Sequence, residues 1–97
     1  MEEELIYNMK NNLQHPIVGH SYAILTGTYV GEIFVLVSEN ESEYLFISIP
    51  KNINRSVPKD KFHYGLSNNI VEYVEKISTK VFNLLKKQHA FNLNPDK

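Results

Sequence analysis

TYVGEIFVLVSENESEYLFISIP, which runs from Thr28 to Pro50, is the stretch around which the rest of this 97-residue chain has to pack. Two runs within it, Ile33–Val37 and Tyr44–Ile49, are rich in the β-branched, aliphatic and aromatic residues that favour strands. A polar, acidic connector joins the two runs. This arrangement predicts an antiparallel β-hairpin.

Side-chain alternation indicates how the two strands pair, because successive residues of a strand point to opposite faces of the sheet. In both runs the odd-numbered residues are aliphatic, whereas the aromatic side chains fall at even numbers. Like residues share a face when odd numbers lie opposite odd numbers: Val37 with Leu45, Val35 with Ile47 and Ile33 with Ile49. This register predicts a connector of odd length, Glu39–Glu43.

Both faces of this hairpin are apolar, one aliphatic and one rich in aromatic residues. A sheet with one face in water alternates apolar with polar residues, so this sheet must be covered on both sides. The aromatic-rich face has two candidate covers, an N-terminal helix of the same chain or a second chain. We favour a second chain, because the N-terminal segment is short and rich in Asn. We therefore predict a two-fold interface formed by Phe34, Leu36, Tyr44 and Phe46.

Other elements are predicted before and after the hairpin. Apolar residues at helical spacing and acidic residues in the first turn predict a short helix over Glu2–Gln14, ended by the proline at position 16. Ile17–Tyr29 is predicted to contain a strand antiparallel to Ile33–Val37. Lys51–Leu66 is the least regular part, with a short fourth strand around Arg55–Val57 or Lys61–Tyr64.

The C-terminal part is predicted to be one long helix that begins after Ser67 or Asn69. Six apolar residues recur at helical spacing: Ile70, Val74, Ile77, Val81, Leu84 and Leu85. This helix is expected to pack on the aliphatic face of the sheet. The resulting fold class is α+β, an antiparallel sheet of three or four strands with a long C-terminal and a short N-terminal helix, in the order α-β-β-β-α. We expect residues 1–97 to form a single domain.

Composition is that of an ordinary soluble globular protein, with 42% hydrophobic and 22% charged residues and a formal net charge of −1. No run is long enough to span a membrane, and the opening Met-Glu-Glu-Glu is unlike a secretory leader. We therefore expect a cytoplasmic protein without membrane association. The frequent Asn and the preference for Lys over Arg suggest a bacterial or phage origin.

Motifs for catalysis, metals or cofactors are not found in the sequence. No cysteine is present, and the four histidines (His15, His20, His63 and His89) lack the spacing of metal ligands on a helix or strand. No nucleophile elbow, phosphate-binding loop or dinucleotide fingerprint occurs. We therefore name no catalytic residue, metal ligand or cofactor, and the sequence contains no positive indication of an enzyme.

Residues 51–64 are the second candidate functional region, because they combine basic and aromatic side chains: Lys51, Arg55, Lys59, Lys61, Phe62, His63 and Tyr64. Such a combination is typical of proteins that bind single-stranded nucleic acid. The competing interpretation is a solvated loop whose Phe62 and Tyr64 pack into the core. We favour that interpretation, because the net charge is negative and no nucleic-acid-binding signature is present.

The function expected from these features is that of a small interaction protein, of the accessory, inhibitor or immunity kind. It is expected to act as a homodimer through the aromatic-rich face, with a further protein partner possible in principle. The alternative is nucleic-acid or anion binding through residues 51–64.

Overall fold

The computed structural model describes residues 15–93, which form five antiparallel strands and two helices, an α+β architecture. The elements follow one another along the chain as β1 (His20–Ile24), β2 (Ile33–Glu39), β3 (Glu43–Ile49), β4 (Ile53–Pro58), α2 (Lys59–Ser67), β5 (Val71–Lys76) and α3 (Thr79–Leu93). The predicted α+β class and antiparallel sheet are confirmed, but the predicted three or four strands and the order α-β-β-β-α are wrong, because the described residues contain five strands with α2 inserted before the last of them. The predicted N-terminal helix, Glu2–Gln14, lies outside the described residues.

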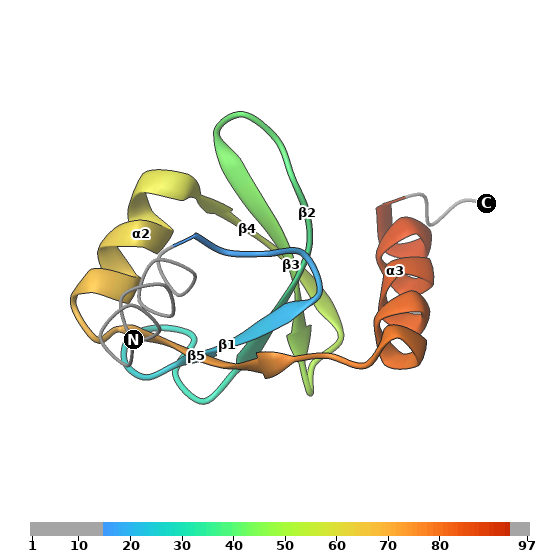
Figure 1. The fold of residues 1–97 in the computed structure, drawn as a ribbon, viewed down its shortest axis with the longest axis horizontal. Coiled ribbons are helices and arrows are strands. Elements are labelled where there is room, and N and C mark those ends of the chain that lie inside the picture. The colour runs from blue at the N-terminus through green and yellow to red at the C-terminus, as the bar shows by residue number, and fades with distance from the viewer. Residues whose placement is uncertain (1–14, 94–97) are drawn as a thin grey trace, which may run out of the picture.

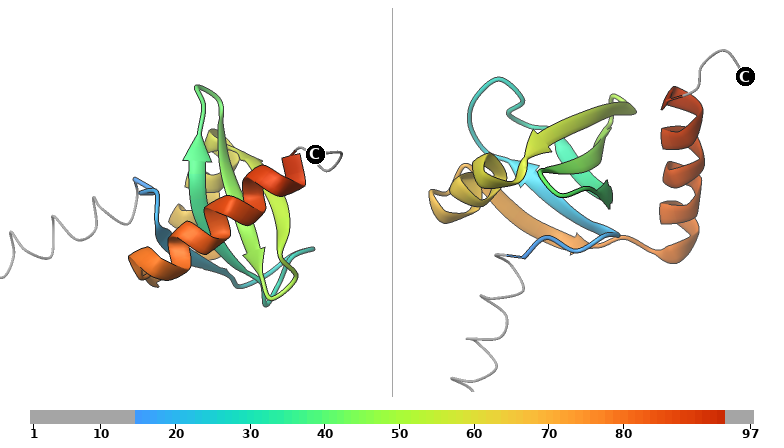
Figure 2. Two further views of the ribbon diagram at one scale, coloured as in Figure 1. Left: turned by 90° about the vertical axis from the view of Figure 1, so that its right-hand side faces the viewer. Right: turned by 90° about the horizontal axis from the view of Figure 1, so that it is seen from above.

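The sheet has the strand order β4-β3-β2-β1-β5. Strands β1 to β4 form a meander, and β5 then returns to pair with the open side of β1. The connection from β4 to β5 runs through α2, which covers one face of the twisted sheet (Figure 1). Helix α3 lies across the opposite face (Figure 2). Both faces of the central hairpin are therefore covered, as expected for a hairpin whose two faces are both apolar.

The predicted hairpin register is confirmed at one end and corrected at the other. Ile33 pairs with Ile49 and Val35 with Ile47, but the register then shifts, so that Ser38 lies opposite Leu45. Val37 is therefore the extra residue of a β-bulge and does not pair with Leu45. The bulge shortens the connector to residues 40–42.

The side chain of Asn40 explains why this short connector is favoured. Its Oδ1 accepts hydrogen bonds from the backbone N–H groups of Ser42 and Glu43, at 2.9 and 2.8 Å. The Asn40 N–H in turn donates to the Glu43 carbonyl oxygen at 3.0 Å. An Asx side chain that satisfies the turn in this way stabilises a tighter loop than the predicted Glu39–Glu43.

The predicted long C-terminal helix is wrong over its first part. Residues Val71–Lys76 form β5, and the helix begins only at Thr79. Only the first three residues, Val71–Tyr73, alternate apolar with polar, whereas Val74 continues the helical spacing from Ile70, so the periodicity of this segment is ambiguous. The open side of β1 resolves the ambiguity, because it supplies backbone partners for a strand, including Ile24 opposite Val71. Strand pairing therefore prevails over the helical stripe.

Strand β4 and helix α2 together replace most of the region that was expected to be irregular. The alternative strand at Arg55–Val57 is confirmed as part of β4, whereas the one at Lys61–Tyr64 is wrong. Pro58 precedes the first helical turn, which contains Asp60, and a carboxylate is favourable there. Phe62 is the residue through which α2 enters the core.

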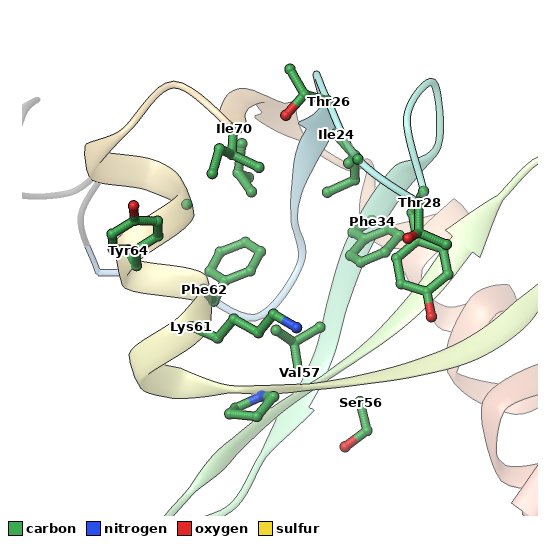
Figure 3. A pocket seen from close by; sticks show the side chains of 15 residues that line it. Ile24, Thr26, Thr28, Phe34, Ser56, Val57, Lys61, Phe62, Tyr64 and Ile70 are labelled. Carbon is green, nitrogen blue, oxygen red and sulfur yellow. The ribbon is translucent and has the colours of Figure 1, made fainter.

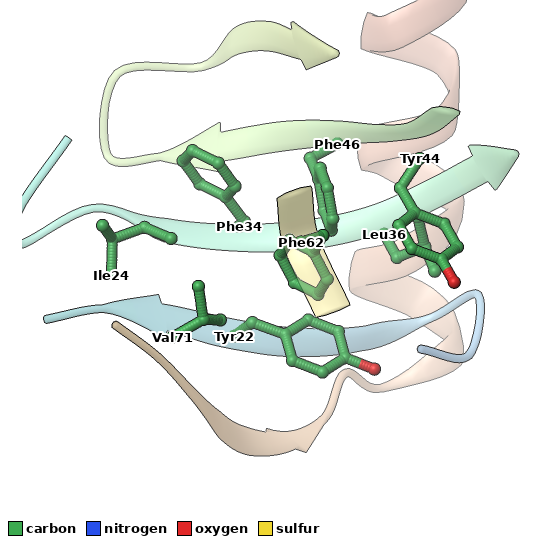
Figure 4. Close-up of a cluster of buried hydrophobic side chains, with 8 residues drawn as sticks. All are labelled: Tyr22, Ile24, Phe34, Leu36, Tyr44, Phe46, Phe62 and Val71. Carbon is green, nitrogen blue, oxygen red and sulfur yellow. The ribbon is translucent and has the colours of Figure 1, made fainter. Parts of the chain in front are cut away.

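The aromatic-rich face of the sheet is buried within one chain, so helix α2 provides the cover that was expected from a second chain. Phe34, Leu36, Tyr44 and Phe46 are each at most 5% exposed. The Phe62 ring of α2 packs against them, with its centroid 4.8 Å from that of Phe46 (Figure 4). Tyr22 of β1 completes the cover from the side. Among the described residues, these four side chains are therefore covered by their own chain, and assembly as a homodimer stays a prediction.

The aliphatic face is covered by α3, as predicted for the C-terminal helix. Val35, Val37 and Ile47 form a second buried cluster with Leu85. Partly buried side chains complete it: Ile49, Ile77 and Phe82. In the part of the chain that the structure describes, no helix is both long enough and apolar enough to cross a membrane.

Candidate binding groove

A groove of about 460 Å³ opens between the β1–β2 connection, the end of β4 and helix α2 (Figure 3). Its volume lies within the usual range for small ligand sites. The residues that line it are contributed by these elements and by the start of β5: Ile24, Thr26, Gly27, Thr28, Tyr29, Phe34, Ser56, Val57, Pro58, Lys61, Phe62, Tyr64, Gly65, Ile70 and Val71.

The floor of the groove is the outer edge of the aromatic core. Phe34, Phe62 and Val71 are buried members of that core and also line the groove. Two tyrosines stand at its rim, Tyr29 at 40% and Tyr64 at 62% exposed. A ligand side chain that entered the groove would therefore meet apolar and aromatic surface on a rigid support.

The β1–β2 connection presents Tyr29 because it folds into a compact turn. Gly27 adopts a φ of +96°, a conformation that side chains disfavour. The Val30 N–H donates to the Gly27 carbonyl oxygen at 3.2 Å, and the Glu32 N–H donates to the Tyr29 carbonyl oxygen at 3.1 Å. These bonds satisfy the backbone locally, so the connection forms a defined wall of the groove.

Lys61 is the one charged residue among those lining the groove. Its side chain extends from α2 across the opening (Figure 3). Within the described residues it has no acidic partner. The hydroxyl-bearing residues Thr26, Thr28 and Ser56 also line the groove. The groove therefore combines an apolar floor with a single uncompensated cation.

The other predicted anion-binding residues have acidic partners. Lys51 and Arg55 both contact Glu32, each with a closest nitrogen–oxygen distance of 3.2 Å. Lys59 contacts Glu39 at 2.8 Å. These three basic groups are neutralised within the fold, so residues 51–64 do not present one continuous cationic surface.

The predicted aromatic partners in this region are also separated from one another. Phe62 is buried in the core, as the competing interpretation of this region expects. His63 lies next to Tyr44, with its Nε2 2.6 Å from the tyrosine hydroxyl oxygen. Tyr64, by contrast, is largely exposed at the groove rim, so it does not pack into the core. Of the seven predicted residues, Lys61, Phe62 and Tyr64 line the groove.

Glu32 is a buried carboxylate that the sequence pattern did not single out. It is 4% exposed and accepts hydrogen bonds from Ser48 Oγ and from Nε and one terminal nitrogen of Arg55. The Ser48 hydrogen bond lowers the pKa of Glu32 to about 2, against the effect of burial and with further help from Arg55 and Lys51. The sequence feature that could have identified Glu32 is its position directly before a strand whose two faces are both apolar.

Arg55 links this buried carboxylate to the groove. Its guanidinium lies over the Tyr29 ring, 4.1 Å from the ring centroid, while its N–H groups bind Glu32. The Tyr29 ring therefore packs against the guanidinium of Arg55, which is in turn held in place by the buried carboxylate of Glu32. This arrangement steadies the groove wall, and it makes Arg55 a supporting residue instead of a ligand-binding one.

The histidines do not assemble a metal site in the described residues, which contain no suitable group of three His, Cys, Asp or Glu side chains. His20 Nδ1 lies 2.8 Å from the Tyr73 hydroxyl oxygen. Burial, and secondarily the charge of Lys76, lower the pKa of His20. His15 contacts His63 edge-on, with ring centroids 6.2 Å apart.

Comparison with known proteins leaves the chain unassigned, since no family model, curated protein or solved structure matches it. The use of the groove must therefore be inferred from its own chemistry.

Proposed function

We propose that this protein is a small interaction module that binds a segment of another protein in the groove between α2 and the β1–β2 connection. The bound segment inserts an apolar side chain against Phe34 and Phe62 and places a carboxylate near Lys61. The observation that carries this proposal is the apolar groove with one cation that has no acidic partner among residues 15–93. Accessory, inhibitor and immunity-type proteins act by contacts of this kind.

Apolar burial supplies most of the affinity in this proposal. Fully burying one large apolar side chain is worth about 1.5–3 kcal/mol. The contact with Lys61 adds only about 0–1 kcal/mol, because the lysine is exposed to solvent. Its main effect is to orient the ligand and to favour acidic over basic segments. Binding is therefore expected to be weak unless contacts extend beyond the groove.

Nucleic-acid binding, the alternative function, is supported less well. Proteins that bind the phosphate backbone use several Lys and Arg side chains together. Lys51, Arg55 and Lys59 are engaged with Glu32 and Glu39. Only Lys61 of the predicted basic set is left for a phosphate group within the described residues.

Selection from a library of random dodecapeptides on the intact protein tests the proposal. We expect enrichment of peptides that combine apolar residues with Asp or Glu, and binding can then be measured by fluorescence anisotropy. Thr26→Trp should fill the groove and abolish binding of the selected peptides. Lys61→Gln should weaken it about threefold and remove the preference for acidic peptides.

Matched control variants place the same changes on α3, away from the groove. Thr79→Trp and Lys80→Gln are at exposed positions and should leave peptide binding unchanged. Equal binding by Thr26→Trp and the intact protein would refute the groove as the site. Oligonucleotide retardation at low salt that Lys61→Gln abolishes would instead support the nucleic-acid alternative.

A further inference from the structure

Residues 1–14, MEEELIYNMKNNLQ, carry the chemistry that the groove is proposed to select. Glu2, Glu3 and Glu4 are followed closely by apolar side chains, among them Leu5 and Ile6. The other acidic stretch, residues 39–43, belongs to the described hairpin, where its end carboxylates contact Lys59 and Ser56. Residues 1–14 are thus a candidate ligand supplied by the chain itself.

The segment joins the described part of the chain beside α2. The His15 ring contacts that of His63 on this helix, and the adjacent Pro16 is buried. The same helix supplies Lys61 and Tyr64 to the groove. At 3.6 residues per turn, His63 points about 200° away from Lys61, so the segment must pass around α2 to reach the groove.

The length of the segment is sufficient for this path. An α-helix with its side chains is about 10–12 Å across. Fourteen residues span about 21 Å as a helix and up to about 50 Å when extended. Because the segment is tethered, its effective concentration at the groove is of millimolar order. Even a weak interaction is therefore well populated within one molecule.

We infer that residues 1–14 occupy the groove of their own chain, with carboxylates of Glu2–Glu4 near Lys61 and apolar side chains on its floor. This inference rests on the proposed function, and it adds an internal competitor for the same site. An outside ligand then binds only to the fraction of molecules whose groove is open, so its apparent affinity is lowered by that fraction.

Paramagnetic relaxation in the full-length chain tests this placement without any outside ligand. The chain lacks cysteine, so Asn8→Cys gives one site for a nitroxide spin label. We expect amide resonances of Thr28, Lys61 and Gly65 to broaden, while those of Lys80 and Leu84 on α3 stay sharp. Lys61→Glu should weaken the broadening, because it replaces an attraction to Glu2–Glu4 by a repulsion. Adding Glu2→Lys, Glu3→Lys and Glu4→Lys to that variant should restore it.

Three outcomes would overturn the inference. One is broadening that is absent from the groove, and another is broadening that Lys61→Glu affects no more than Lys80→Glu does. The third is broadening that is equally strong when spin-labelled chains are mixed with separate isotope-labelled chains, which would place the segment on a second copy. The variant Glu2→Lys, Glu3→Lys, Glu4→Lys should release the segment and leave the groove open to outside ligands. If this variant enriches no peptides although the unmodified segment broadens the groove resonances, the proposed function is refuted and the inference stands.

Discussion

At the scale of single residues, Glu32 is a buried carboxylate that links the β1–β2 connection to two strands. It lies at the end of the β1–β2 connection and binds Ser48 on β3 and Arg55 on β4. Removing the carboxylate would leave the half-buried Arg55 without its partner and loosen the support of Tyr29. Breaking such a pair from one side is costly, because a charge is then left desolvated.

Acid titration should reveal the contribution of Glu32 to stability. Its pKa lies at about 2 in the folded protein and near 4.5 in the unfolded chain. The ionised, bonded form therefore stabilises the fold fully above about pH 4.5, and this stabilisation is lost as the pH falls toward 2. Urea unfolding across this range should show a falling free energy of unfolding, and Glu32→Gln should flatten the fall. Glu41→Gln, at an exposed position in the hairpin loop, is the matched control. An equal slope in both variants would contradict this assignment.

At the scale of elements, α2 is the piece that makes the fold and the groove possible. It covers the aromatic face through Phe62, forms one side of the groove and carries Lys61. Its sequence, KDKFHYGLS, has no long apolar stripe and includes a glycine, which is unfavourable inside a helix. The helix is stabilised more by its contact with the core than by helix propensity. For this reason its sequence alone did not predict a helix.

A substitution at Gly65 tests how closely α2 packs against β5. A Cβ at this position would lie 2.9 Å from Cγ2 of Val71, whose branched side chain has little freedom to move. Gly65→Ala should therefore destabilise the protein by about 1–3 kcal/mol from overpacking, which outweighs the gain of about 1 kcal/mol in helix propensity. Thermal unfolding measures this change. Adding Val71→Ala to Gly65→Ala should recover part of the loss relative to the sum of the two single changes. Simple additivity would show that the two positions do not interact.

At the scale of the whole molecule, two separate clusters lie on opposite faces of one sheet. The aromatic cluster is covered by α2, and the aliphatic cluster is covered by α3. The four residues predicted to join two chains instead form the interior of one chain. Their substitution is therefore expected to affect stability before it affects assembly.

Phe46→Ala should distinguish a core role from an interface role. Phe46 is fully buried, so the truncation should lower the free energy of unfolding by about 3–5 kcal/mol. Leu84→Ala on α3 is the control, since Leu84 is 59% exposed and its truncation should cost less than about 0.5 kcal/mol. Urea unfolding and light scattering together check both expectations. A stable Phe46→Ala protein whose molar mass is halved would instead restore the dimer interpretation.

The sequence by itself determined the central hairpin, the chemistry of its two faces and the need to cover both. Alternation within Ile33–Val37 and Tyr44–Ile49 is a local property, so it can be read without knowing the remaining contacts. The sequence also predicted β1 and a strand at Arg55–Val57. It identified Lys61, Phe62 and Tyr64 as candidate binding residues, but it did not predict the groove that they share.

Only the tertiary structure decided which segments provide the covers and where the groove lies. Residues Val71–Lys76 continue the helical spacing of Ile70, Val74 and Ile77, but pairing with the open side of β1 made them a strand. Likewise, the partners of Lys51, Arg55 and Lys59 come from distant positions, which left Lys61 as the cation of the groove. Such choices depend on contacts between residues far apart in the chain, and local periodicity and charge carry no information about them.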